Sequence, residues 1–421
     1  MNKIAIVGLG YVGLPLAVEF SKKNKVIGFD ISERRINELS EGHDGTLEVS
    51  ESALQGALAR EDNGGSLFFT SEITGLSDCE VFIITVPTPI NEFKSPDLTP
   101  LQTASRSVGG VIKKGALVIY ESTTYPGCTE EVCVPELENA SGFVFNMDFF
   151  VGYSPERIVP GDKVHGLVNI PKVTSGSTSK IALKVDELYS SIIVAGTHSA
   201  PSIKVAEASK LVENCQRDVN ISLINELTYI FDRVGISIFD VLDAASTKWN
   251  FIKLIPGLVG GHCISVDPYY MVHKAQSLNY HPEVITSGRR VNEYMPEFLA
   301  SKLVKELIHR GKTPTACNCI VLGLTFKENC PDMRNSKSID LVREIKDFGV
   351  EIEVHDPVAK LSPSLGLSSV ENFSKYDIVV LAVPHAEYLV DMRLDSLLKD
   401  GRSFVFDFKR ALPKQDWILT L

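Results

Sequence analysis

The N-terminal stretch through Asp30 constrains the fold of this chain more than any other segment. An apolar run, KIAIV, leads into GLGYVG, and after a helical pattern over 14–23 a second apolar run ends at Asp30. Gly8, Gly10 and Gly13 allow a tight turn, the close approach of a pyrophosphate to a helix N-terminus, and helix–strand packing. The segment therefore predicts a dinucleotide-binding βαβ unit. A carboxylate at Asp30 accepts from ribose hydroxyls and repels a 2′-phosphate, which favours NAD over NADP.

Three further apolar runs, at 66–70, 80–86 and 116–122, predict more strands of the same sheet. In open parallel sheets, ligands bind at the carboxyl ends of the strands. Thr88 and Thr123 follow two of these runs, so both are candidates to contact the dinucleotide. Each is equally typical of a turn at the end of a strand.

Charged residues near this sheet have two interpretations each. Arg35, shortly after Asp30, is either a contact for the adenine side of the cofactor or a solvated helix arginine. Glu156 and Arg157 stand together in the Pro/Gly-rich segment FFVGYSPERIVPGD. A carboxylate beside an arginine is often a local ion pair, whereas in a cleft the two can serve as a general base and an anion clamp.

The middle of the chain is predicted to be helical. Apolar residues recur with helical periodicity over 201–234, without internal Gly or Pro, and a second helical pattern covers 282–310. Lys210, Asn214 and Arg217 fall at i, i+4 and i+7, on one face of the long helix. This face either meets water or presents an amide and two cations to an oxyanion and a phosphate. An apolar helix of this length suggests dimerisation.

Between those helices lies GLVGGHCISVDPYY, which contains Cys263 and, four positions later, Asp267. Gly260 and Gly261 carry no side chains, so the backbone before the sulfur can approach a ligand closely. A thiolate in such a loop can act as a nucleophile, and Asp267 can bind a water or hold a lysine. The alternative is a buried, inert cysteine in a glycine turn.

The chain after GKTPT, at 311–315, repeats the alternation of strands and helices without a GxGxxG motif. The apolar runs are CNCIVLGL, EIEVHDP, DIVVLAV and SFVFDFKR, with a helical pattern over 336–348. Lys327, Arg334 and Arg410 follow predicted strands and suit phosphates, or else form surface ion pairs. This region is a second doubly wound domain, so we predict three domains, at 1–198, 199–312 and 313–421.

Composition narrows the classes of function. The 421 residues suffice for two or three domains, and 44% hydrophobic and 23% charged residues are typical of a globular protein. A net charge of −11 argues against nucleic acid or an anionic membrane surface as a partner. We expect a cytoplasmic protein, because no segment is a candidate membrane span and the chain enters a strand without a signal peptide. The eight cysteines show no paired CxxC spacing, so we expect no metal.

Taken together, these segments resemble the UDP-glucose/GDP-mannose dehydrogenase family over nearly the whole chain. The signatures are GLGYVGLPLA, ESTTYPG, SPERIVPGD, the helix with Lys210 and Asn214, PGLVGGHCISVDPYY and GLTFKENCPDMRNS, in the family's order. NFIKLIPGLVGGHCI and the PYY after Asp267 resemble the branch that acts on UDP-N-acetylhexosamines for bacterial surface polysaccharides. The resemblance implies an α/β protein with two Rossmann-like doubly wound parallel sheets, joined by a helical middle domain that has one long helix and forms a homodimer.

The resemblance also implies a four-electron oxidation of a sugar C6 hydroxyl to a carboxylate with two NAD. The alcohol proton would leave through Lys210 or a water held by Asp267. Cys263 would trap the aldehyde as a thiohemiacetal, which keeps it bound during cofactor exchange, and a second oxidation would give a thioester. Lys210 and Asn214 would stabilise oxyanions, and Glu156 would act on the hydrolytic water as a base or by positioning it. The expected substrate is UDP-N-acetylglucosamine, with UDP-GalNAc, UDP-ManNAc and UDP-glucose as alternatives.

The residues that match the family's sites form three groups. The catalytic group is Cys263, Lys210, Asn214, Asp267, Glu156 and Thr123. The cofactor group is Gly8, Gly10, Tyr11, Val12, Gly13, Asp30, Arg35, Thr88, Thr123 and Arg334. The substrate group is Arg157, Ile158, Lys210, Asn214, Arg217, Gly260, Phe326, Lys327 and Arg410, with Lys409 as an alternative to Arg410.

Two other functions are compatible with the fold. A two-electron NAD dehydrogenase or epimerase-like enzyme would leave Cys263 structural. A silent nucleotide-binding or scaffold protein would not need Cys263, Asp267, Lys210, Asn214 and Glu156 together. The four-electron hypothesis predicts that Cys263 faces the gap between the two α/β domains, a few ångströms from Lys210, Asn214 and Asp267.

Overall fold

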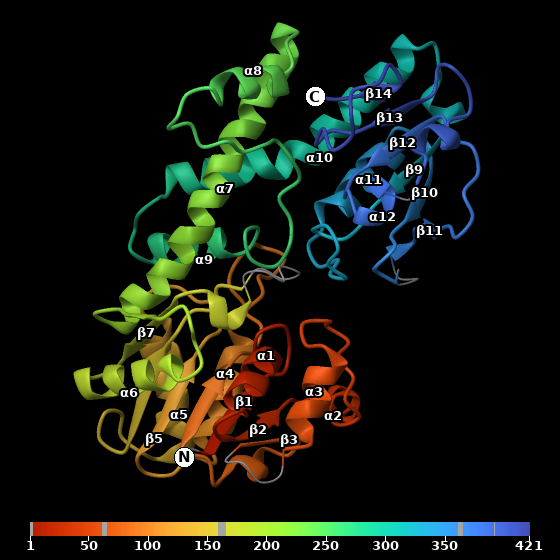
Figure 1. The fold of residues 1–421 in the computed structure, drawn as a ribbon. Coiled ribbons are helices and arrows are strands. Elements are labelled where there is room, and N and C mark those ends of the chain that lie inside the picture. The colour runs from red at the N-terminus through yellow and green to blue at the C-terminus, as the bar shows by residue number, and fades with distance from the viewer. Residues whose placement is uncertain (1–2, 61–64, 159–165, 361–364, 391) are drawn as a thin grey trace. The chain divides into compact units, whose positions relative to one another are not determined.

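The computed structural model describes residues 3–60, 65–158, 166–360, 365–390 and 392–421 (Figure 1). The chain divides into two compact units, one of Met1–Glu213 with Tyr269–Asn279 and one of Asn214–Pro268 with Tyr280–Leu421. The long helix α7 (Ile203–Val234) passes from the first unit into the second. The division into three domains at 198 and 312 stays a prediction.

Within the described residues, the first unit has an eight-stranded sheet in the order β3-β2-β1-β4-β5-β6-β7-β8. Its neighbouring strands pair parallel, except that β6 pairs antiparallel with β7. The order 3-2-1-4-5-6 is that of the doubly wound dinucleotide fold, here extended at one edge. The strands are β1 (Lys3–Val7), β2 (Lys25–Phe29), β3 (Ser66–Thr70), β4 (Val81–Ile84), β5 (Ala116–Tyr120), β6 (Phe149–Tyr153), β7 (Lys172–Gly176) and β8 (Thr197–Ser199).

Alternation along the strands decides which helices cover this sheet. Ile4 and Ile6 of β1 belong to one buried cluster with apolar residues of α1, α2, α3 and α6. Helices α4 and α5 pack against each other, and α4 also contacts β4. Helices therefore bury the sheet, which explains why its strands are nearly continuous apolar runs. The helices are α1 (Gly13–Phe20), α2 (Glu33–Ser40), α3 (Glu51–Leu58), α4 (Thr99–Gly109), α5 (Val134–Ser141) and α6 (Ser179–Ser190).

The second unit repeats the same topology with other strands. Its described sheet has the order β11-β10-β9-β12-β13-β14, and all its pairs are parallel. Counted along the chain, this is again the order 3-2-1-4-5-6. The strands are β9 (Asn318–Leu322), β10 (Glu351–His355), β11 (Ser368–Ser369), β12 (Ile378–Leu381), β13 (Phe404–Phe406) and β14 (Ile418–Leu419).

Both faces of this second sheet are also covered. Cys319 and Val321 of β9 pack in a cluster with α10 and α11, whereas Ile320 and Leu322 pack in another cluster with Tyr388 of α12. The remaining α-helices of the described residues are α7, α8 (Ile238–Ala245), α9 (Asp267–Ser277), α10 (Glu283–His309), α11 (Lys337–Asp347) and α12 (Ala386–Val390). Among the described residues, no helix has the length and apolar character needed to span a membrane.

The predicted fold class, two parallel-sheet α/β domains with a helical middle region, is confirmed. The helix predicted over 201–234 is α7 (Ile203–Val234), and that predicted over 282–310 is α10 (Glu283–His309). The segment FFVGYSPER is not only a loop, because its first part forms β6 (Phe149–Tyr153). Strands β7 and β8 were not predicted, since KVTSG and THS are short and polar.

Candidate active site

The turn between β1 and α1 brings backbone unusually close to backbone. Gly8 has φ +96°, and a Cβ at Gly13 would lie 1.9 Å from the Gly8 carbonyl oxygen. Thr85 donates its hydroxyl to the same carbonyl at 2.6 Å. A Cβ at Gly10, in contrast, would meet nothing within 4 Å. The turn is therefore packed on one side and open at Gly10, as a pyrophosphate site requires.

Asp30 links this turn to the next strand. Its carboxylate accepts from Leu9 N at 2.9 Å and from Ser32 N at 2.9 Å. A carboxylate accepts about four hydrogen bonds, so capacity remains for the ribose hydroxyls of a dinucleotide. Arg35 is not a solvated arginine, because it donates to Leu9 O at 3.0 Å and pairs with Asp44 at 2.7 Å. The glycine turn and Asp30 together fit NAD.

The other predicted cofactor residues of the first unit surround the same edge of the sheet. Tyr11 and Val12 lie in the turn before α1, and Thr88 and Thr123 lie beyond the carboxyl ends of β4 and β5, all partly buried. The strand order reverses at β1 and β4, which is where doubly wound sheets bind ligands.

Glu156 lies just after β6 and is buried with 8% of its surface exposed. One carboxylate oxygen accepts from the backbone amides of Arg157 and Ile158, each at 2.6 Å, and the other accepts from Lys172 Nζ at 3.0 Å. Burial works against ionisation, but the charges of Lys172 and Lys210 and the Ile158 amide hold the pKa of Glu156 below its ordinary value. The residue is therefore a fixed, ionised carboxylate.

Arg157 does not pair with the neighbouring Glu156 carboxylate. Its guanidinium binds Glu213 of α7, at 2.8 and 3.2 Å, and donates to the Pro171 carbonyl at 2.8 Å. The structure thus separates the two residues that adjacency in the sequence had suggested as a pair. Ile158 contributes its backbone amide to Glu156.

The predicted polar face of α7 is not a solvated stripe. Lys210 and Asn214 are buried, with 7% and 8% exposed, whereas Arg217 is exposed. Asn214 Nδ2 donates to the Asp267 carboxylate at 2.5 Å, and Asp267 is only 2% exposed. The structure brings Asn214 and Asp267 together, and the predicted proximity of Cys263 to Lys210 stays a prediction.

Cys263 differs from the other cysteines of the chain. All eight cysteines lie in the described residues, and Cys263 is the one that is not buried. Burial raises the pKa of Cys79 to about 11 and that of Cys215 to about 12, so those thiols are poor nucleophiles. The Cys263 carbonyl accepts from Asp267 N at 2.8 Å, where α9 begins. A helix N-terminus stabilises negative charge, which suits a sulfur that attacks as a thiolate.

The glycines before Cys263 pack against the chain itself. A Cβ at Gly260 would lie 2.5 Å from Asn335 O, and one at Gly261 would lie 2.8 Å from the ring of Phe326. The loop is also held at Gly257, where Asn225 donates to the carbonyl and accepts from the amide, both at 3.0 Å. Close packing against the second α/β domain therefore requires these glycines, beyond any approach of a ligand.

The predicted phosphate-binding cations of the second unit have internal partners. Arg410 pairs with Asp243 at 2.8 Å and stacks on Phe239, with 4.8 Å to the ring centroid. Lys409 binds Glu328 at 3.1 Å. The Lys409 Cε would lie 3.9 Å from a Cβ at Gly257, at the start of the cysteine loop.

Two further predicted residues lie near that loop. Arg334 binds Asp332 at 2.6 Å, and the ring of Phe326 meets His262 edge-on at 5.7 Å. Lys327 directly follows Phe326, in the turn after β9.

Several site residues were missed from the sequence, namely Thr85, Glu121, Lys172 and Asn225. Lys172 is 51 residues from Glu121 and 16 from Glu156, so no local motif joins them. The one available signal for Glu121 was its place at the carboxyl end of the strand predicted over 116–122. Asn225 lies in a helix amid apolar residues and carries no signal of its own.

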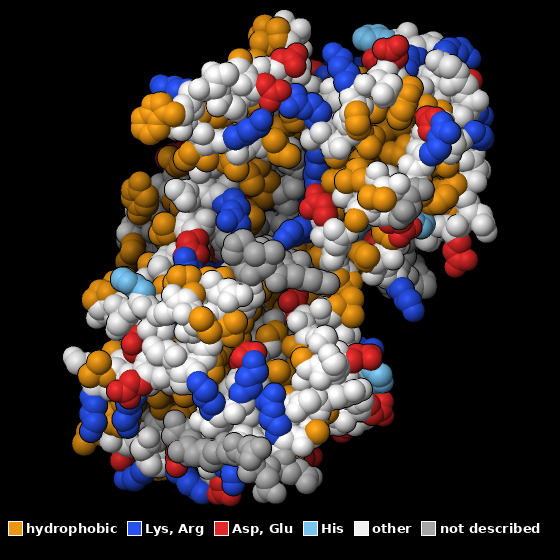
Figure 2. Space-filling model, in the orientation of Figure 1, with side chains coloured by type: hydrophobic (Ala, Val, Ile, Leu, Met, Phe, Trp, Pro, Cys, Tyr) orange, Lys and Arg blue, Asp and Glu red, His pale blue; other side chains and the backbone are white. Residues whose placement is uncertain are grey.

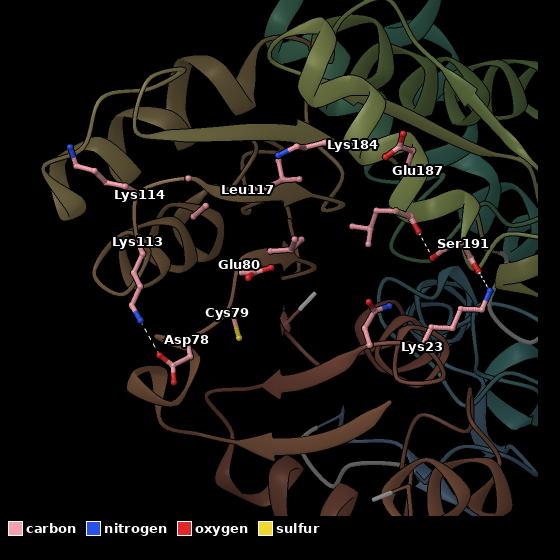
Figure 3. Close-up of a pocket in the computed structure, with 15 residues that line it drawn as sticks. Lys23, Asp78, Cys79, Glu80, Lys113, Lys114, Leu117, Lys184, Glu187 and Ser191 are labelled. Atoms are coloured by element: carbon pink, nitrogen blue, oxygen red, sulfur yellow. Dashed lines mark hydrogen bonds and ion pairs between the residues drawn. The ribbon is translucent and has the colours of Figure 1, made fainter. Parts of the chain in front are cut away.

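A cavity of about 830 Å³ opens elsewhere in the first unit, where β4 and β5 begin (Figure 3). Lys113 binds Asp78 at its wall at 2.9 Å, and Lys23 donates to the Ser191 carbonyl at 2.5 Å. Among the described residues, its lining includes no predicted site residue. Because parallel sheets bind ligands at the opposite ends of their strands, we do not place the active site in this cavity.

The glycine turn and Asp30 on a doubly wound sheet define an NAD-binding protein. Family models describe this chain in three parts: the NAD binding domain matches residues 2–193, the central domain 204–294 and the UDP binding domain 320–414. The chain belongs to the UDP-glucose/GDP-mannose dehydrogenase family. The predicted family and the predicted cofactor are confirmed.

Similar proteins cover nearly the full chain. It is 54% identical over 417 residues to the UDP-N-acetyl-D-glucosamine 6-dehydrogenase of Pseudomonas aeruginosa, with 97% of each chain covered. It is 50% identical over 421 residues to the Salmonella typhi protein of the same name, with 98% of this chain and 97% of that protein covered. The solved structure of a UDP-D-ManNAc dehydrogenase from Pyrococcus horikoshii matches with a TM-score of 0.88 at 31% identity, covering 99% and 98% of the chains.

Proposed function

We propose that this protein oxidises the C6 hydroxyl of UDP-N-acetylglucosamine to a carboxylate through a covalent intermediate on Cys263. The observation that carries the proposal is Cys263 itself, the one cysteine of eight that is not buried, placed where α9 begins. The likeness to two UDP-N-acetyl-D-glucosamine 6-dehydrogenases supports the choice of sugar. From the resemblance of the sequence we also propose a cytoplasmic enzyme whose product enters surface polysaccharide synthesis.

The first unit would hold the cofactor. Gly8, Gly10 and Gly13 would admit the pyrophosphate, Asp30 would bind the ribose, and Thr88 and Thr123 would line the same edge of the sheet. NAD supplies the oxidising power, because its nicotinamide accepts one hydride, so two molecules are consumed per sugar. We also retain Tyr11, Val12, Arg35 and Arg334 as proposed cofactor contacts.

Two buried donors would stabilise the oxyanions of the reaction. The Lys210 ammonium and the Asn214 amide are one helical turn apart on α7, in a region shielded from water. Asp267 takes one N–H of the Asn214 amide and so fixes its orientation, while the second N–H stays available to donate. Asp267 would therefore orient Asn214 as well as bind water.

The thiol of Cys263 would carry the sugar between the two oxidations. Its thiolate adds to C6 of the aldehyde, which forms a C–S bond, and loss of a hydride from C6 then gives a thioester. Water adds to that thioester, the C–S bond breaks, the thiolate leaves, and the two protons of the water pass to solvent. Because the pKa of Glu156 is held low, despite burial, by Lys172, we assign Glu156 to holding this water rather than to taking its proton.

The proposed UDP-sugar contacts include residues of both units. Both cations already have an acidic partner, Asp243 for Arg410 and Glu328 for Lys409, but Lys409 lies close to Gly257 and is therefore the better candidate of the two. The remaining proposed contacts are Arg157, Ile158, Lys210, Asn214, Arg217, Gly260, Phe326 and Lys327.

The test is the number of NADH formed per UDP-N-acetylglucosamine at limiting sugar. Two NADH are expected from the wild type and no turnover from Cys263→Ser, whereas Cys79→Ser, which changes a buried thiol, should behave as the wild type. One NADH per sugar with an active Cys263→Ser would favour the two-electron alternative and reject the proposal. UDP-GalNAc, UDP-ManNAc, UDP-glucose and GDP-mannose in parallel would identify the sugar.

We also propose a homodimer through the central helical region. Helix α7 exposes large apolar side chains, with Val212 57%, Leu223 54% and Ile230 46% exposed. Figure 2 shows hydrophobic side chains at the surface over the part of the molecule that contains α7 and α8. Light scattering should give twice the chain mass, and Leu223→Glu with Ile230→Glu should give a monomer; a monomeric wild type would reject the proposal.

A further inference from the structure

Four residues of the first unit form a buried polar cluster, namely Glu156, Lys172, Glu121 and Tyr189. Lys172, at the start of β7, donates from Nζ to Glu121 at 2.7 Å and to Glu156 at 3.0 Å. Tyr189 of α6 donates its hydroxyl to the second oxygen of Glu121. The side chains of Lys172 and Glu121 are 3% and 0% exposed, and that of Glu156 is 10% exposed. The buried ammonium of Lys172 therefore donates to two carboxylates, those of Glu121 and Glu156.

Both backbone amides and a side chain hold the Glu156 carboxylate. Two backbone amides bind one of its oxygens, and Lys172 binds the other. Glu156 thus has little rotational freedom, and its orientation depends on a residue that is too deeply buried to meet a substrate. Replacing Lys172 would release the oxygen that the amides do not hold.

The two carboxylates respond differently to the shared lysine. Burial raises the pKa of Glu121 to about 7, although Lys172 opposes the rise. The pKa of Glu156 is lowered in spite of burial, because Lys172, the Ile158 amide and Lys210 all favour its charged form. Burial lowers the pKa of Lys172, but its two carboxylate partners outweigh burial and raise it. Environments that separate two carboxylates in this way are typical of sites where one must stay ionised.

Buried ion pairs alone are weak evidence for stability, because removing charges from water is costly. This cluster, however, includes Glu156, the carboxylate that we propose holds the hydrolytic water. We propose that Lys172 is a positioning residue that fixes Glu156 for its action on water. The inference rests on the proposed role of Glu156.

The proposal makes the two substitutions differ. Lys172→Met removes the cation that favours ionised Glu156, so the loss of activity on acidification should begin at higher pH. Because burial raises the pKa of Glu121 to about 7, Glu121 is already neutral at the pH where Glu156 takes up a proton, and Glu121→Gln should leave that loss near the wild-type pH. A purely structural role predicts lower stability in both variants without a shift of that loss in Lys172→Met.

The readout is the decay rate of the thioester on Cys263, measured in full-length enzyme given UDP-N-acetylglucosamine and NAD and quenched at a series of pH values. We expect the acid limb to move up by about one pH unit or more in Lys172→Met and to stay near the wild type in Glu121→Gln. Lys172→Arg keeps the charge and should stay near the wild type, as should Lys180→Met, an exposed lysine on α6.

The outcomes distinguish a failure of this inference from a failure of the proposed function. An acid limb that does not move in Lys172→Met, or that moves down, overturns the inference, provided that the wild type forms two NADH per sugar. If Lys172→Met does not fold, Lys172→Gln, which keeps a hydrogen-bond donor without the charge, decides instead, and an unmoved limb in that variant also overturns it. A wild type that forms no thioester instead overturns the proposed function.

Discussion

The two doubly wound sheets share an order of strands and a local geometry, yet they end in different chemistry. In each, the first strand runs into a glycine with positive φ, Gly8 at +96° and Gly323 at +89°. In each, an aspartate after the second strand accepts from the amide that follows this glycine. Asp30 binds Leu9 N at 2.9 Å, and Asp356 binds Leu324 N at 2.7 Å.

The difference lies in what else the aspartate binds. Asp30 is partly buried and keeps acceptor capacity, beside a turn that is open at Gly10. Asp356 also accepts from the amides of Thr325, Val358 and Ala359 and contacts His385 at 3.3 Å. Its capacity is therefore used internally, so the second sheet keeps the scaffold of a dinucleotide site without the group that binds ribose. Fold alone does not decide the ligand.

The glycine turn should give the largest effect. Gly13→Ala places a Cβ 1.9 Å from the Gly8 carbonyl, so we expect a loss of about 3 kcal/mol or more in the free energy of unfolding. Gly10→Ala should fold normally and raise the KM for NAD, because its Cβ enters open space. Thermal unfolding and NAD kinetics check both, and a Gly13→Ala protein as stable as the wild type would refute this packing.

Exchanging the two aspartates for alanine should separate stability from cofactor binding. Asp356→Ala leaves buried amides unpaired and should cost about 2 kcal/mol of stability without changing the KM for NAD. Asp30→Ala should raise the KM for NAD about tenfold, equivalent to about 1.4 kcal/mol, with a smaller loss of stability. If both variants weaken NAD binding equally, the distinction between the sheets is wrong.

Acid should reduce the stability that the Asp356 carboxylate provides. Burial opposes ionisation, but His385 and the amides of Leu324 and Val358 lower the pKa of Asp356 to about 2. A lowered carboxyl pKa gives stability that is present above the ordinary pKa of about 4 and is lost as the pH falls through about 2. The stability difference between the wild type and Asp356→Asn should therefore shrink over that interval in urea unfolding at each pH. A constant difference would contradict the assigned pKa.

Much of the fold could be predicted because buried parallel strands are continuous apolar runs. The runs KIAIV and SLFFT coincide with β1 (Lys3–Val7) and β3 (Ser66–Thr70). Strand β7 could not be predicted, because Lys172 and the polar residues after it are buried through tertiary partners that the local sequence does not show. Its antiparallel pairing with β6 is likewise a property of the assembled sheet.

The residues of the candidate site could likewise be predicted only where their pattern is local in the sequence. Cys263 and Asp267 could be singled out because a glycine-rich loop with a thiol is a local pattern. Adjacency misled in the case of Glu156, whose partner is Lys172 rather than Arg157. Arg410 also has a partner, Asp243, which lies 167 residues away in the sequence and which only the folded chain brings to it. Long-range ion pairs have no signature in a single sequence.

The most direct test of the account is the mass of the Cys263 peptide during turnover. Glu156→Gln, which should slow hydrolysis, is mixed with UDP-N-acetylglucosamine and NAD, quenched and digested. We predict an acyl adduct on the peptide that contains Cys263, together with two NADH per subunit, and no adduct in the Cys263→Ala, Glu156→Gln double variant. Two NADH formed with an unmodified Cys263 peptide would contradict covalent catalysis by this residue.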